Sequence, residues 1–204
     1  MRATDRPKGS RANHTERARL FCAIELPAEL RALIAARSEK LRSSAYGTAA
    51  RWEASEKLHL TLKFLGEIET TRLSALALAV QRATERIASF ELQLGGPGVF
   101  PPRGPARVLW IGLNDPTGRL AALQQKLEAE CRKQGFPPET KSFHPHVTIA
   151  RLRTQAPPLL ALHLETAIES RRFTVREVVI MRSELRPEGS RYTPLASFDL
   201  GHEV

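Results

Sequence analysis

Two short segments of the chain pair a histidine with a threonine two residues later. They are His59-Leu60-Thr61-Leu62 and His146-Val147-Thr148-Ile149. On a β-strand, residues i and i+2 face the same side, so each segment would present an imidazole and a hydroxyl together while its apolar residues face a core. Two imidazoles with an ordinary pKa near ~6.5 can hold complementary protonation states at neutral pH. The pattern therefore predicts a site for acid–base chemistry built from two half-sites.

The stretches that precede the two segments also match each other. The strand-like run Arg19–Leu26 and a helical stretch come before His59, and the strand-like run Arg107–Leu113 and a second helical stretch come before His146. The first run starts 40 residues before its histidine, and the second starts 39 residues before. We therefore expect a duplicated strand–helix–strand unit, with the two His-x-Thr strands meeting at the interface between two lobes.

Three segments, Arg19–Pro27, His59–Gly66 and Pro145–Arg151, resemble the 2H phosphoesterase superfamily. Within it they are most similar to the RNA 2′,3′-cyclic phosphodiesterases, also called 2′-5′ RNA ligases, and the resemblance extends over about residues 19–200. It implies a bilobal, duplicated fold in which two antiparallel sheets line a central cleft and helices cover the outer faces. It also implies metal-independent hydrolysis of a terminal 2′,3′-cyclic phosphate to a 2′-phosphate, with a weak reverse 2′-5′ ligase activity.

The hydrophobic pattern independently predicts an α+β fold. Besides the runs already named, it predicts strands at Leu58–Leu65, Phe90–Leu94, Phe143–Leu152, Phe173–Arg182 and Tyr192–Leu200, and helices from Pro27 to about Leu41 and at Thr70–Ala88, Thr117–Gln134 and Leu159–Glu165. Gly66 is expected to end the first motif strand, and the glycine- and proline-rich stretch Gly95–Pro105 is expected to be loop.

The resemblance gives roles to the motif residues. It implies that His59 is the general acid toward the leaving O3′ and His146 the general base toward water, although the residues themselves leave the order of the two roles open. Thr61 and Thr148 can donate hydrogen bonds to the charged phosphate oxygens, and Arg151 can add a cationic clamp. This scheme needs no metal and no other cofactor.

Four further side chains are candidate substrate contacts. Lys63 alternates onto the face of His59, and Trp52 and Tyr192 could stack on a base. His144 would share a strand face with His146, so these two histidines and His59 could instead form a three-histidine metal site. We do not favour that alternative, because the threonines would then have no role.

Composition points to a polyanionic partner. The 204 residues include 31 lysines and arginines against 22 acidic residues, which gives a formal net charge of +9. This excess favours RNA as the substrate. Cys22 and Cys131 show no metal or redox spacing, and no apolar run approaches the ~20 residues that span a bilayer. We expect a cytoplasmic monomer with a flexible basic arm at residues 1–18 and a single bilobal domain at residues 19–204.

Two other functions remain open at this point. A related 2H phosphoesterase could act on a small cyclic nucleotide, and a non-catalytic module could hold single-stranded RNA through its charge and aromatic residues. A binding module has no need for both His-x-Thr pairs. A double histidine substitution that abolishes turnover but preserves RNA affinity would therefore favour the enzyme.

Overall fold

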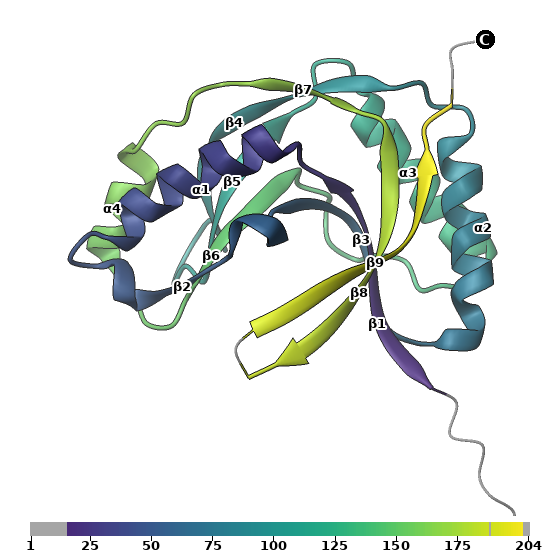
Figure 1. Ribbon diagram of the computed structural model, residues 1–204, viewed down its shortest axis with the longest axis horizontal. Helices are drawn as coiled ribbons and strands as arrows, with labels where there is room; N and C mark the ends of the chain where they lie inside the picture. The colour runs from purple at the N-terminus through teal and green to yellow at the C-terminus, as the bar shows by residue number, and fades with distance from the viewer. Residues whose placement is uncertain (1–15, 188, 202–204) are drawn as a thin grey trace, which may run out of the picture.

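The computed structural model describes residues 16–187 and 189–201 of the chain (Figure 1). In chain order the elements are β1 (Arg17–Glu25), α1 (Ala28–Arg42), the short 3-10 helix η1 (Gly47–Ala49), β2 (Ala50–Trp52), η2 (Ser55–Lys57), β3 (His59–Glu69), η3 (Thr70–Arg72), α2 (Leu73–Thr84), β4 (Phe90–Phe100), β5 (Val108–Asn114), α3 (Arg119–Lys133), β6 (His146–Leu152), α4 (Pro157–Glu165), β7 (Arg172–Val175), β8 (Glu177–Arg186) and β9 (Gly189–Asp199). Most of the expected basic arm lies outside the described residues, but Arg17 and Ala18 belong to β1.

The strands form one curled antiparallel sheet with two halves. Its order is β7-β4-β5-β6-β3-β1-β8-β9, and β2 pairs with residues 150–152 of β6, beyond the point where β3 pairs with it. The halves β7-β4-β5-β6 and β3-β1-β8-β9 are joined by a single register pair, Leu60 with Val147. The predicted α+β class and the meeting of the two motif strands are both confirmed.

With the following helix included, the two repeats are β1-α1-β3-α2 and β5-α3-β6-α4, and each half of the sheet is covered by one helix from each repeat. The helix after β1, α1, packs against α4 and β2, and α4 contacts β4. The helix after β5, α3, packs against α2 and β3, and α2 contacts β8 and β9. Figure 1 shows the result, with α1 and α4 on one side of the molecule and α2 and α3 on the other. The two repeats therefore exchange a helix, so neither half is a continuous stretch of chain.

Two strands are longer than expected from the glycines in their sequences. Gly66 does not end β3; it adopts a φ of 68° at a β-bulge opposite β1, and the strand continues to Glu69. The segment expected to be loop after Leu94 instead continues β4 to Phe100, again past an irregularity in the pairing. Bulges accommodate such residues within a strand. Gly98 is needed there because a Cβ at this position would overlap the ring of Trp110.

A buried arginine and histidine tie α1 to α4 and to the sheet. The Arg37 guanidinium donates to the carbonyl oxygens of His163 and Thr166 at 2.7 and 2.6 Å, which satisfies carbonyls at the end of α4. His163 Nε2 donates to the Gly98 carbonyl oxygen at 3.0 Å, and its Nδ1 accepts from Arg37 at 3.3 Å. His163 is fully buried and therefore neutral. Burial lowers its pKa to about 4, and the Arg37 charge adds to the effect.

No helix among the described residues is both long enough and apolar enough to cross a bilayer.

His163 should make the stability of the protein fall with acid. Its pKa is about 4 in the folded protein and ~6.5 in the unfolded chain, so below about pH 6.5 the unfolded state binds the extra proton. We expect His163 to contribute about 2 kcal/mol to the loss of unfolding free energy between pH 7 and pH 5. Urea denaturation at both pH values checks this. His163→Gln should show a smaller loss than the wild type, and an equal loss in the two proteins would contradict the assignment.

Candidate active site

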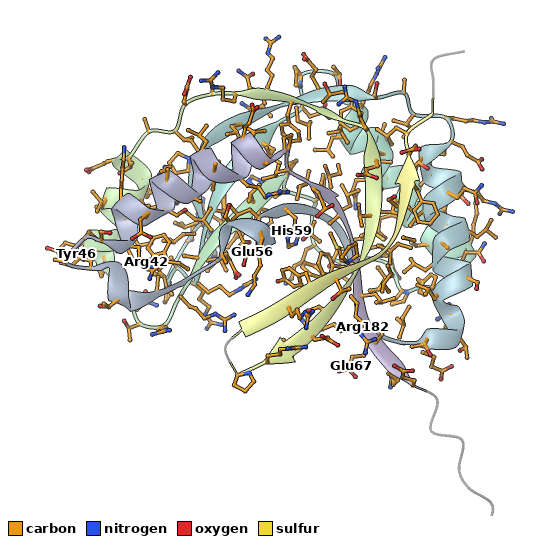
Figure 2. All side chains as sticks on the ribbon, viewed as in Figure 1. Arg42, Tyr46, Glu56, His59, Glu67 and Arg182 are labelled. Carbon is orange, nitrogen blue, oxygen red and sulfur yellow. The ribbon has the colours of Figure 1, made fainter. Side chains whose placement is uncertain are left out.

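His59 is the first residue of β3 and is held from both ring nitrogens. Its Nδ1 donates to the Lys57 carbonyl oxygen at 2.6 Å, and its Nε2 lies 3.0 Å from the Thr61 hydroxyl. A carbonyl oxygen only accepts, so Nδ1 carries the proton in the neutral ring and Nε2 is left with a lone pair. Figure 2 shows His59 and Glu56 between α1 and the β8–β9 hairpin.

His146, at the start of β6, has the same Nδ1 contact as His59. Its Nδ1 donates to the His144 carbonyl oxygen at 2.6 Å, so the neutral ring again leaves Nε2 as the basic nitrogen. Thr148 follows on the same face, half-buried between the buried residues Val147 and Ile149. The two predicted half-sites therefore share one geometry, in which a carbonyl two residues upstream orients each imidazole.

Aromatic rings surround each imidazole. The His59 ring lies 5.0 Å from Phe21 and 5.2 Å from Tyr192. The His146 ring lies 4.9 Å from Phe100 and 6.1 Å from Trp110. This burial lowers the pKa of both histidines below the ordinary value, because a partly desolvated ring resists protonation.

A β-bulge after each motif changes which residues face the site. Opposite β1, Leu62 is skipped between Thr61 and Lys63, and opposite β5, Ile149 is skipped between Thr148 and Ala150. Each bulge reverses the alternation that follows it. The residue five positions after each histidine, Phe64 in β3 and Arg151 in β6, is consequently exposed on the histidine face.

Lys63 therefore does not share the face of His59 and Thr61, and that prediction is wrong. Lys63 is only 3% exposed and points to the opposite side of β3. Its ammonium forms an ion pair with Glu128 of α3 at 2.7 Å and donates to the Pro137 carbonyl oxygen at 3.0 Å. The regular alternation assumed for the strand is broken by the bulge at Leu62.

Arg151 is a cation close to both half-sites. Its charge helps to lower the pKa of both His59 and His146, so it acts on both half-sites. Its Nε lies 3.7 Å from the carboxylate of Glu53, which follows β2 and donates its backbone N–H to the Ile149 carbonyl oxygen. Glu53 also raises the pKa of Tyr192, after the larger effect of burial. Sequence reasoning missed Glu53, because a single acidic residue in a connection carries no motif.

The remaining candidate contacts have different surroundings. Trp52 is half-buried against the core and its indole N–H donates to the Gly47 carbonyl oxygen at 2.9 Å, which is a structural contact. His144 is exposed, with its ring edge-on to Trp110 at 4.8 Å and to Phe100 at 5.5 Å. Tyr192 lies directly beside His59.

The three-histidine metal site finds no support in this arrangement. Within the described parts of the chain, no group of three or more histidine, cysteine, aspartate or glutamate side chains is placed to hold a metal ion.

The chain is similar in sequence to known proteins over most of its length. A family model described as the 2′-5′ RNA ligase superfamily matches residues 29–187. The RNA 2′,3′-cyclic phosphodiesterase of Methanothermobacter thermautotrophicus is 32% identical over 187 residues, which cover 89% of this chain and 98% of the relative. The Escherichia coli protein of the same name is 32% identical over 187 residues, covering 91% of this chain and 98% of the relative.

Solved structures show the same fold. A Thermus thermophilus protein superposes with a TM-score of 0.76 at 30% identity, covering 91% of this chain and all of the other. Escherichia coli LigT complexed with 3′-AMP superposes with a TM-score of 0.72 at 32% identity, covering 91% of this chain and 99% of the other.

The buried ion pair of Lys63 and Glu128 should respond unequally to the loss of each partner. Glu128→Ala leaves an uncompensated buried ammonium and should lower the unfolding free energy by about 3 to 5 kcal/mol. Lys63→Met removes the buried charge itself and leaves the more exposed Glu128, so it should cost less. Urea denaturation of both variants measures the difference. A larger loss of unfolding free energy for Lys63→Met would contradict the burial of the Lys63 ammonium.

Proposed function

Because the chain belongs to the 2′-5′ RNA ligase superfamily, we propose that it is an RNA 2′,3′-cyclic phosphodiesterase. The reaction opens the cyclic phosphate at an RNA end and leaves a 2′-phosphate. The observation that carries the proposal is the matched pair of imidazoles, each with its Nδ1 held by a backbone carbonyl and its Nε2 available for proton transfer.

In this proposal the two Nε2 nitrogens serve the two ends of an in-line displacement. Neutral His146 accepts a proton from water as the water oxygen forms a bond to phosphorus. Protonated His59 donates its proton to O3′ as the bond between phosphorus and O3′ breaks. The step ends with His146 protonated and His59 neutral, and exchange with solvent restores the starting forms. The order of these roles follows the family resemblance described above.

The charge on the phosphate oxygens is met by groups on the same faces. The hydroxyls of Thr61 and Thr148 donate to the non-bridging oxygens, and the Arg151 guanidinium supplies a positive charge. Glu53 orients that guanidinium through their ion pair. None of these steps requires a metal ion or another cofactor.

A single incubation tests the proposed reaction. A short RNA with a 2′,3′-cyclic phosphate end is mixed with the protein in the presence of a chelator, and the position of the product phosphate is determined. We expect a 2′-phosphate product and full activity in chelator. A 3′-phosphate product would overturn the assigned leaving group, and activity that returns only with zinc or manganese would overturn the metal-independent mechanism.

Both histidines should be required for turnover. General acid–base catalysis by one group contributes typically ~10²–10⁴-fold, so His59→Ala and His146→Ala should each reduce kcat by that order. Each variant should retain its melting temperature within a few degrees and its affinity for RNA. Near-wild-type turnover in either variant would contradict the two-histidine mechanism, whereas a wild type that binds RNA without any turnover would favour a binding module.

The pH dependence should reflect the lowered pKa values. In the free enzyme the base must be deprotonated and the acid protonated, and both pKa values lie below the ordinary one. We therefore expect a bell-shaped profile of kcat/KM whose optimum lies below about pH 6.5. Bound phosphate favours the protonated imidazole, so the alkaline limb of kcat should lie at higher pH. A kcat/KM optimum above pH 8 would contradict this.

A further inference from the structure

A cavity of about 340 Å³ opens next to the catalytic histidine proposed above, between η2 and the β8–β9 hairpin. Its lining includes Glu56, Lys57, Arg186, Ser190, Arg191 and Tyr192. We call it the hairpin pocket. β1 pairs with β8 only as far as Ser183, so the end of the hairpin extends beyond β1 as a two-stranded ribbon, and Figure 1 shows it projecting from the sheet.

The hairpin pocket is lined by more positive than negative charge. Among the described lining residues there are three cations, Lys57, Arg186 and Arg191, and one carboxylate, that of Glu56. Arg186 is paired with Glu184 at 3.2 Å, whereas neither Lys57 nor Arg191 forms an ion pair within the parts of the chain that the structure describes. Lys57 Nζ reaches across to the hairpin, 3.7 Å from the position that a Cβ on Gly189 would occupy. These are the groups that bind a phosphate, together with the hydroxyls of Ser190 and Tyr192.

The hairpin pocket is directly connected to the first half-site. Tyr192 lines the pocket and also contacts the His59 ring edge-on at 5.2 Å. Lys57 lines the pocket, and its carbonyl oxygen holds His59 Nδ1. These two residues place the cations of the pocket beside a nucleotide bound at His59.

We propose that the hairpin pocket is a second phosphate subsite, which binds the phosphodiester on the 5′ side of the terminal nucleotide. The inference rests on the proposed function, because it takes the cyclic phosphate to lie at His59. It names a substrate class, since the pocket would favour an RNA end or a 5′-phosphorylated nucleotide over a nucleotide that carries only the cyclic phosphate.

Binding of two product analogues that differ by one group tests the pocket without any turnover. Adenosine 2′,5′-bisphosphate should bind about tenfold more tightly than adenosine 2′-phosphate, as expected for one charge-assisted contact. Arg191→Gln should remove most of this difference, and Arg191→Lys should restore part of it. Arg132→Gln, which removes the same charge from an exposed position on α3, should leave the ratio of the two affinities unchanged. Equal affinities in the wild type, or a ratio that Arg191→Gln does not change, would overturn the subsite.

Turnover separates this inference from the proposed function. The same comparison uses kcat/KM for adenosine 2′,3′-cyclic phosphate with and without a 5′-phosphate. Arg191→Gln should lower the ratio of the two values. Arg151→Ala should lower kcat/KM for both substrates. If the wild type hydrolyses neither these substrates nor cyclic-ended RNA, the proposed function fails, and the affinity ratio still decides the subsite.

Discussion

The geometry of the site depends on one hydrogen bond made twice, from an imidazole Nδ1 to the backbone carbonyl two residues before it. Lys57 and His144 supply these carbonyls just ahead of β3 and β6. Because the acceptor is a backbone carbonyl, no second side chain is needed to orient the ring. The bond selects one tautomer, so the path of the backbone determines that Nε2 is the nitrogen with the lone pair. The side chains of these two residues are therefore free to make other contacts. Lys57 lines the hairpin pocket, and His144 lies beside Trp110.

The alternation of side chains along a β-strand predicts correctly which residues face the site only up to the first β-bulge. It correctly placed His59 with Thr61 and His146 with Thr148, because these pairs lie before the bulges. It failed for Lys63, where one extra residue moved the side chain into the core. A bulge depends on the pairing of two strands distant in sequence, so neither strand alone reveals it. The role of Glu53 was hidden for the same reason, because only the fold brings it to Arg151.

The two half-sites are similar in construction and different in chemistry. The equivalent position carries a guanidinium in β6 and an exposed phenyl ring, Phe64, in β3. Behind the His146 half, the neutral His163 and the Arg37 cation hold β4 to α4. Behind the His59 half, an ion pair between Lys63 and Glu128 holds β3 to α3. Each half of the sheet thus has its own polar attachment to a helix layer, and only one backbone pair joins the two motif strands to each other.

The exchange of α1 and α3 between the halves restricts how such a fold could be divided. One repeat alone would leave its own half-sheet without the helix that comes from the other repeat, and it would present a helix with no sheet to cover. Two identical copies of a repeat could bury both faces only by trading helices, which is the arrangement of a domain-swapped homodimer. The present chain has the topology expected if such a dimer had been fused into one polypeptide, after which the two motif strands were free to differ in sequence.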